Sequence, residues 1–303
     1  MSLYLSPIFI YNYTHLLTGL FKKMINKKKE KKGKDPNEEM SFLEHLEELR
    51  WHFIRAFLSI IVISIIVFIE KDIVFDKIIL HPKMPDFWTN RMFARLSDFL
   101  GTDALRINTH PFQLISINMS GQFMTHIWTS IIGGLIVASP YVIFEFWQFV
   151  KPALYDKERK NSTGAVFYMS GLFIIGVLFG YYLIVPLSIN FLGSYSISTN
   201  VINQINILSY INTVASITLA GGVIFELPVF VFFLSKVGIL TPEFMIKYRK
   251  HSYVILLVLS AIITPPDVFS QILVCIPLVF LYEIGIIISR NVEKKNKEEM
   301  NAM

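Results

Sequence analysis

Glu226 is the residue whose type and surroundings most clearly suggest chemistry, because its carboxyl group lies in the apolar stretch AGGVIFELPVF. An ionisable side chain in such a run is costly to bury and is a candidate functional residue by default. A helix would place it about 15 Å from the basic end of its stretch at Lys236, near the centre of a bilayer. The alternative is a protonated carboxyl hydrogen-bonded to a neighbouring helix or to backbone freed by Pro228. Glu145 and Glu283 lie closer to basic residues, so snorkelling or local hydrogen bonding explains them about as well as any function.

A second group of acids lies in SFLEHLEELR, residues 41–50. Ser41 and Glu44 have capping-box spacing, and the apolar residues share one face, which predicts a short amphipathic helix at the cytoplasmic surface. Its apolar face consists of Phe42, Leu46 and Leu49, and its polar face presents Glu44, Glu47 and Glu48. Taken alone, these acids are typical of a solvated helix face.

The stretch SAIITPPDVFSQILV sets two prolines and an aspartate inside the most apolar part of the chain. Proline removes a backbone donor and clashes with the preceding helical turn, so a continuous helix is excluded here. We expect Pro265 and Pro266 to end one helix and begin the next. Asp267 then lies near a helix N-terminus, where the helix dipole favours negative charge.

Motifs of self-contained enzymes are absent from the sequence. It contains no G-x-x-x-x-G-K phosphate loop, no H-E-x-x-H, no C-x-x-C and no Ser and His pair that the topology would bring together. The single cysteine, Cys275, permits no internal disulfide. We therefore expect a protein that is not an enzyme and that needs no metal or other cofactor.

The composition indicates whether the chain folds in water or in a membrane. Of 303 residues, 53% are hydrophobic and 17% are charged, the mean hydropathy is +0.51, and the apolar residues form long blocks. Because a membrane-spanning helix needs about 20 mainly apolar residues, this pattern predicts an all-α, polytopic membrane protein. The long candidate spans are 51–69, 123–150, 165–192, 208–235 and 268–289.

A sixth apolar stretch, 253–263, is too short to cross a relaxed bilayer, since its eleven residues reach about 16 Å as a helix. We count six transmembrane helices, of which the fifth and sixth form a short, shallow hairpin that distorts the membrane around it.

Orientation follows from the positions of Lys and Arg. These residues are concentrated in the tail up to Arg50, in the connections after the second and fourth spans and in the C-terminal tail, whereas 193–207 and 264–267 contain none. Both termini are therefore expected in the cytoplasm. The net charge of +5 sets orientation and gives no indication of nucleic-acid binding.

Two further segments complete the organisation. Residues 87–100 carry Trp88, Met92, Leu96 and Phe99 on one helical stripe, which predicts an amphipathic helix on the outer surface; an irregular loop is the alternative. We divide the chain into an N-terminal extension at 1–39, a membrane domain at 40–290 and a charged cytoplasmic tail at 291–303. Residues 1–23 are an interfacial anchor, a poor signal-like segment or sequence upstream of the true start.

Four motifs resemble, in order and spacing, those of the TatC family, the six-span subunit of the twin-arginine protein translocase. They are SFLEHLEELR before the first span, FWQFVKPALYDKERK after the second, GGVIFELPV in the fourth and TPPDVFSQ at the outer turn. Each motif is weak alone, but the four together are specific and cover residues 40–290. The N-terminal extension and the long first outer loop depart from the family pattern.

The resemblance implies a receptor for Arg-Arg signal peptides on folded cargo in the bacterial cytoplasmic (inner) membrane. It implies single-span partners of the TatA and TatB type, use of the proton-motive force and assembly as a homo-oligomer. Glu48 and Glu158 match acids that contribute to reading the signal, and Arg50 and Phe149 match positions tied to the same surface. Glu226 matches the intramembrane acid associated with partner contact.

Two other classes of protein remain as alternatives. A small-solute secondary transporter also carries midplane carboxylates, but it should show repeated halves and matched helix breaks, which this sequence lacks. A purely structural scaffold would need no clustered cytoplasmic acids.

Overall fold

The computed structural model describes residues 42–103, 105–109, 112–150, 162–198, 200, 203–264 and 268–301. Its contacts divide the chain into residues 1–50 and 51–303, and each unit is described by itself. The N-terminal extension 1–39 lies outside the described residues, so its separation as a domain stays a prediction.

Long helices dominate the described residues, as the sequence predicts. The longest are α2 (Phe42–Ile69), α4 (Gly121–Val150), α6 (Ser162–Phe179), α8 (Ile207–Phe225) and α12 (Val268–Asn301). The shorter ones are α3 (Trp88–Leu100), α7 (Val185–Ser194), α9 (Leu227–Lys236), α10 (Pro242–Lys247) and α11 (Arg249–Ile263). Wider π-turns form η2 (Ile73–Ile79) and η5 (Gly180–Ile184), and η3 (His81–Lys83) is a 3₁₀ turn. The short strands β1 (Leu114–Ile115) and β2 (Ile205–Asn206) pair in parallel, Leu114 opposite Ile205 and Ile115 opposite Asn206.

Five helical segments of the described residues are long and apolar enough to cross a membrane, which confirms the five long spans. They are Leu49–Ile69, Gly121–Val150, Val166–Ser194, Ile207–Lys236 and Ser270–Glu298. The third span joins α6, η5 and α7, and the fourth joins α8 and α9. The fifth predicted helix, α11, has 15 residues and reaches about 22 Å, which is shorter than a hydrocarbon core of about 30 Å.

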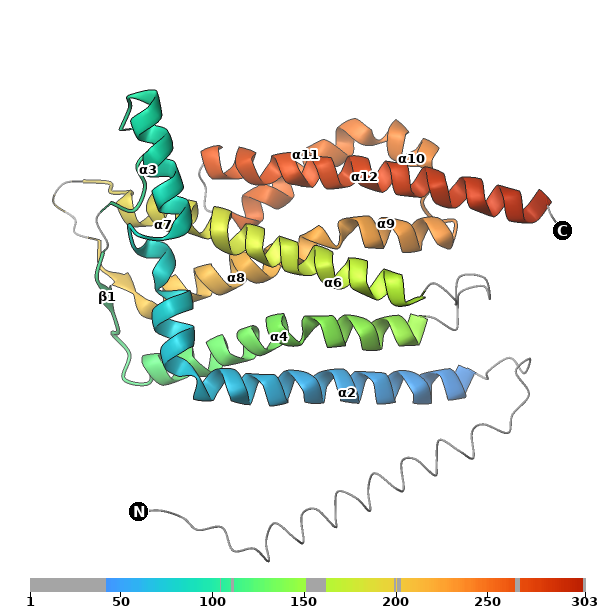
Figure 1. Cartoon of the computed structure of the whole chain (residues 1–303), viewed down its shortest axis with the longest axis horizontal. Coiled ribbons are helices and arrows are strands. Elements are labelled where there is room, and N and C mark those ends of the chain that lie inside the picture. Colours follow the sequence, from blue (N-terminus) through green and yellow to red (C-terminus); the bar gives the residue numbers. More distant parts are fainter. Residues whose placement is uncertain are drawn as a thin grey trace, which may run out of the picture. The chain divides into compact units, whose positions relative to one another are not determined.

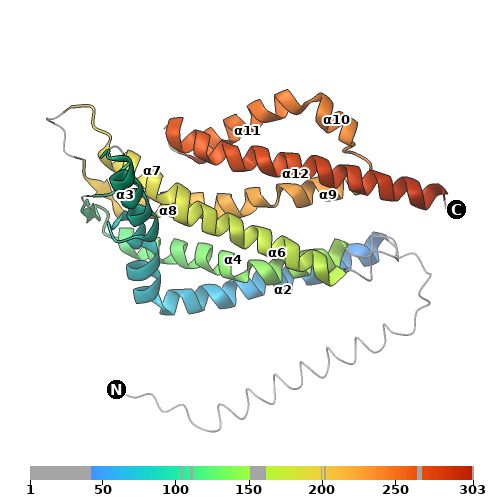
Figure 2. The ribbon, with the colours of Figure 1, turned by 45° about the horizontal axis from the view of Figure 1, so that its top comes forward.

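Within residues 51–303 the five segments lie roughly parallel (Figures 1 and 2). α6 packs on α8, α4 packs on both, and α12 packs on α9 and α11. A buried apolar cluster joins the second half of the third span and the first half of the fourth to α12; its most buried members include Ile184, Val185, Ile211, Val214 and Leu278.

The backbones of α6 and α8 touch at a pair of glycines. A Cβ atom added at Gly176 would collide with the carbonyl oxygen of Gly221, and one added at Gly221 would lie 2.5 Å from the carbonyl oxygen of Gly176. Glycine at these positions lets two membrane helices approach closely enough for backbone-to-backbone packing.

Helices α11 and α12 are described on both sides of the residues that connect them. The hydroxyl of Thr264 donates to the carbonyl of Ser260 at 2.8 Å and closes the end of α11. Pro265, Pro266 and Asp267 lie outside the described residues, so their roles stay predictions. α12 continues without a break to Asn301, and the part predicted as a charged tail is helical that far.

The first outer loop contains the predicted amphipathic helix. Residues 88–100 form α3, so the alternative of an irregular loop is wrong. α3 lies at one end of the spans, near α7, and is transverse to their axes (Figures 1 and 2).

Candidate functional sites

The predicted signal-reading residues are described only in part. Glu48 lies in α2, but its side chain is outside the described residues, as is the whole of Glu158. Arg50 is exposed, and Phe149 is half-buried in the last turn of α4. The assembly of these four residues into one site stays a prediction.

Glu226 stands at a break between two helices. It caps the end of α8 and precedes α9, and its carbonyl accepts hydrogen bonds from the backbone of Val229 at 2.9 Å and of Phe230 at 3.1 Å. Pro228 lies in the first turn of α9, where its missing N–H interrupts the helical hydrogen-bond ladder. The sequence therefore breaks the fourth span at its one acidic residue.

The carboxyl group of Glu226 is unsatisfied. Both of its oxygens are buried, and neither has a hydrogen-bond partner among the described residues. The backbone of Phe173 on α6 lies near the carboxyl, but not with the distance and angle of a hydrogen bond. The alternative drawn from the sequence, a protonated carboxyl hydrogen-bonded to a neighbouring helix or to freed backbone, stays a prediction.

The walls around Glu226 are apolar. One turn earlier, Gly222 faces the ring of Phe173 and the side chain of Val177 on α6. The adjacent Phe225 packs its ring 5.3 Å from that of Phe179. A buried carboxyl without a donor costs free energy, so a donor supplied from outside the chain would be bound favourably.

Glu145 presents the opposite arrangement, and sequence reasoning did not identify its partners. The residue is 3% exposed. The ring of His52 on α2 donates to one carboxylate oxygen at 2.5 Å, and the Tyr141 hydroxyl donates to the other at 2.6 Å. The guanidinium of Arg55 lies 3.6 Å away. The three-residue spacing of His52 and Arg55 on one face of the first span was the available signal.

Glu283 on α12 links this helix to α11 through two residues near the start of α11. Its carboxylate accepts a hydrogen bond from Arg249 Nε at 2.7 Å and a second from the Tyr253 hydroxyl at 2.5 Å. Local hydrogen bonding, one of the two explanations offered from the sequence, therefore accounts for this acid.

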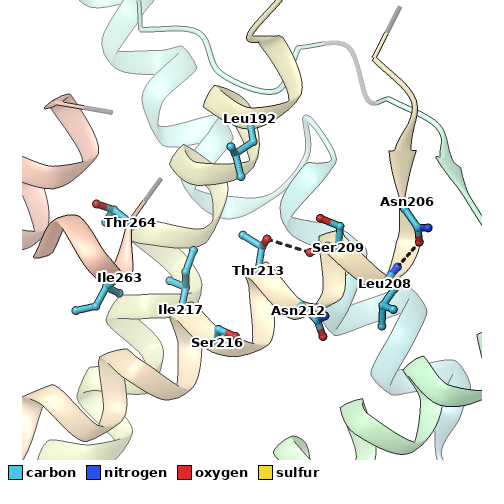
Figure 3. Close-up of a pocket in the computed structure, with 10 residues that line it drawn as sticks. All are labelled: Leu192, Asn206, Leu208, Ser209, Asn212, Thr213, Ser216, Ile217, Ile263 and Thr264. Atoms are coloured by element: carbon cyan, nitrogen blue, oxygen red, sulfur yellow. Dashed lines mark hydrogen bonds between the residues drawn. The ribbon is translucent and has the colours of Figure 1, made fainter. Parts of the chain in front are cut away.

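A cavity of 610 Å³ opens beside the first half of α8 (Figure 3). Four polar residues of α8 line it: Ser209, Asn212, Thr213 and Ser216. Ile263 and Thr264, at the end of α11, line it as well, together with Ile217. The end of α11 thus borders the same cavity as Ile217, which lies about 15 Å along α8 from its first residue.

Metal chemistry has no candidate in this part of the molecule. The described residues contain no group of three or more His, Cys, Asp or Glu side chains that could hold a metal ion.

Comparison with known proteins gives one consistent family. Residues 44–277 match the family model of the Sec-independent protein translocase protein (TatC), a range that contains every site residue predicted above. A Sec-independent protein translocase protein TatC from Blattabacterium is 40% identical over 264 residues, which cover 86% of this chain and 99% of that relative. The TatC protein of Aquifex aeolicus is 31% identical, covering 87% of this chain and 100% of that relative.

Solved structures agree with the sequence comparison. A crystal structure of the twin-arginine translocase receptor TatC in DDM superposes with a TM-score of 0.63 at 31% identity, covering 81% of this chain and 99% of that chain. A second crystal structure of the same receptor gives a TM-score of 0.58 at 29% identity over 82% of this chain.

Proposed function

This chain belongs to the TatC family of Sec-independent protein translocase proteins, and we propose on that premise that it is the twin-arginine signal-peptide receptor of its translocase. As a family member it is a core translocase subunit, so the alternative of a small-solute transporter is set aside. The family match over most of the chain is the observation that carries the proposal. The test is complementation of a strain lacking its own TatC-type subunit, measured by export of a folded reporter with an Arg-Arg signal. Failure of a correctly inserted chain to restore export would contradict the proposal.

Glu48 and Glu158 are proposed as the acidic reader of the signal. Arginine suits such a site because its planar guanidinium makes paired hydrogen bonds to a carboxylate, which a lysine ammonium cannot reproduce. Each charge-assisted hydrogen bond contributes about 1.5–3 kcal/mol, so loss of one acid should weaken binding from severalfold to about a hundredfold.

The reader can be tested with peptide chemistry. Arg-Arg and Lys-Lys signal peptides are crosslinked to the wild type, Glu48→Gln and Glu158→Gln, with Glu47→Gln as the matched control because Glu47 is an exposed neighbour on the same helix. We expect the first two variants to lose the preference for Arg-Arg and the control to keep it. Full preference in the first two variants would remove these acids from the reader.

Arg50 and Phe149 are proposed to border the same surface. Phe149 ends the aromatic run FEFWQF, which can hold the apolar part of a signal peptide or stack on a guanidinium. Phe149→Ala should therefore weaken crosslinking of Arg-Arg and Lys-Lys peptides alike, whereas the Glu variants affect their discrimination.

Glu226 is proposed as the docking point for a polar side chain on the transmembrane helix of a TatA- or TatB-type subunit. Its unsatisfied carboxyl oxygens support this role, because a donor on a partner helix would satisfy them within the membrane. Glu226→Ala should weaken partner crosslinking and leave signal-peptide binding nearly intact. Equal loss of both would indicate a folding role.

We further propose six spans in the bacterial inner membrane, both termini in the cytoplasm, homo-oligomeric assembly and transport driven by the proton-motive force. The basic residues of the connections support this orientation. Tags at residues 160 and 245 should resist protease added from outside; cleavage at either position would contradict the topology.

The hairpin of α11 and α12 is proposed to thin the bilayer locally. The shortness of α11 and the polar cavity beyond its tip support this, because lipid tails would not cover Ser209, Asn212 and Ser216 favourably. A spin label at Ile263 should lie well below the outer headgroup level of the bulk lipid. A label at that level would rule out thinning.

The N-terminal extension is proposed to be dispensable over residues 1–23. A chain that begins at Met24 should insert and export a reporter as the full chain does. Insertion with loss of export would assign these residues a function.

A further inference from the structure

Helix α3 buries its polar side and exposes its apolar side. Its buried residues are Thr89, Asn90, Phe93 and Ser97. Its exposed stripe consists of Trp88, Met92, Leu96 and Phe99, of which Phe99 is 86% exposed and Trp88 56% exposed. Exposure of four large apolar side chains to water is costly in proportion to their area, so this stripe requires a cover.

Hydrogen bonds from the polar side hold α3 in this rotation. The Thr89 hydroxyl donates to the carbonyl of Tyr182. The Asn90 amide donates to the carbonyls of Pro82 at 3.0 Å and Met84 at 2.7 Å, and it accepts a hydrogen bond from the amide of Asn108 at 3.2 Å. Turning the stripe toward the rest of the described residues would break these bonds in a buried setting, so its cover comes from outside the described part of the chain.

The neighbours of α3 place it at the depth of the outer leaflet. Trp88 packs edge-on against Tyr182, with ring centroids 6.1 Å apart. Tyr182 lies about 24 Å along the third span from Val166, within a hydrocarbon core of about 30 Å. Further along α3, Phe93 belongs to a buried apolar cluster with Leu187, and Leu273, in the first turns of α12, packs against that cluster.

The charged residues of α3 form a third side. Arg91, Arg95 and Asp98 are exposed, and helical periodicity places them beside the stripe and away from the buried face. Asp98 is paired with Arg106 at 2.5 Å. A transverse helix with an apolar stripe flanked by arginines matches a surface of lipid tails and anionic headgroups.

We propose that α3 inserts this stripe into the outer leaflet of the bilayer, with Arg91 and Arg95 at the phospholipid headgroups. The occupant is lipid, since the stripe lies at leaflet depth. The first outer loop is then anchored in the membrane as well as on the protein.

Single-cysteine labelling of the full-length chain tests the insertion. Cys275→Ser removes the native thiol, and an environment-sensitive fluorophore is attached at Met92→Cys or Phe99→Cys, with Asp98→Cys and Asp103→Cys as controls on exposed polar positions. The chain is placed in vesicles of phosphatidylethanolamine and phosphatidylglycerol. We expect nitroxide on the lipid tails to quench the stripe labels severalfold more than the controls, and aqueous iodide to show the reverse order.

Three outcomes would overturn the proposal. Iodide could reach the stripe labels as freely as the controls, which would place α3 in water. Both quenchers could be excluded from the stripe, which would show a protein cover. The double variant Arg91→Gln, Arg95→Gln should lose part of the tail-nitroxide quenching in vesicles with phosphatidylglycerol and none in phosphatidylcholine alone; equal loss in both would exclude the headgroup contact.

Discussion

Glu145 and Glu226 are both carboxyl side chains within apolar spans, but their surroundings differ. Glu145 receives hydrogen bonds from His52 and Tyr141, so its interactions are completed inside the protein. Glu226 has two buried oxygens without a partner among the described residues and stands at a helix break. A buried carboxyl whose hydrogen bonds are all made within the protein stabilises the packing of its helices. A buried carboxyl without hydrogen-bond donors can still accept hydrogen bonds from a binding partner. The first therefore indicates a structural role, and the second agrees with the partner contact that we propose for Glu226.

The largest effect is expected at the satisfied acid. Glu145→Leu leaves His52 and Tyr141 without their acceptor, which should lower the free energy of unfolding by about 3 kcal/mol. The measurement is the thermal midpoint Tm of the purified chain in detergent, with Glu47→Leu as an exposed control. An unchanged Tm would mean that the link between α2 and α4 does not stabilise the fold.

A smaller loss is expected at the helix crossing that positions the unsatisfied acid. Gly176→Ala places a methyl group against the backbone of Gly221 and should cost about 2 kcal/mol by overpacking. Gly171→Ala is the matched control, because it lies on the same helix with nothing within 4 Å of the added atom. If Gly176→Ala and Gly171→Ala have the same thermal midpoint Tm, then α6 and α8 are not closely packed at Gly176 and Gly221.

The difference between Glu145 and Glu226 can be predicted from the sequence only where it depends on residues close together in the chain. The five long spans, α3 and the special position of Glu226 follow from local composition and from one proline, so they could be predicted. The bond from His52 to Glu145 joins residues far apart in the chain, and its prediction requires knowledge of how α2 is rotated against α4. Similarly, the sequence gives the apolar stripe of α3, but the burial of its opposite, polar face depends on tertiary hydrogen bonds from Thr89 and Asn90.

Replacement of Glu226 should raise the free energy of unfolding, whereas replacement of Glu145 should lower it. Glu226→Leu removes two buried unpaired oxygens and should raise the stability of the isolated chain by up to about 1 kcal/mol, while partner crosslinking falls. Glu226→Gln keeps polar atoms in the same place and serves as the control for volume. A destabilisation as large as that of Glu145→Leu would show that Glu226 has a partner within the fold. The two acids would then not differ in role.

The smallest effect is expected at Trp147, which is buried two residues after Glu145 and has an indole N–H without a partner among the described residues. Its ring packs 5.6 Å from that of Phe233 on α9, so the contact is with the same broken span that carries Glu226. Trp147→Phe keeps an aromatic ring and removes the unpaired N–H donor. The loss of packing destabilises the fold, and the removal of a buried unpaired donor stabilises it. Because the two effects nearly cancel, the free energy of unfolding should change by about 0.5 kcal/mol or less. Trp147→Ala, which removes the ring, should cost about 3 kcal/mol and shows that the assay detects loss of packing at this site. If Trp147→Phe were as damaging as Trp147→Ala, the N–H would be engaged by a polar group such as a bound water. The Trp147 N–H would then be a group hydrogen-bonded to water, unlike Glu145, which is hydrogen-bonded to protein. The carboxyl of Glu226 would also have to be interpreted as hydrogen-bonded to water.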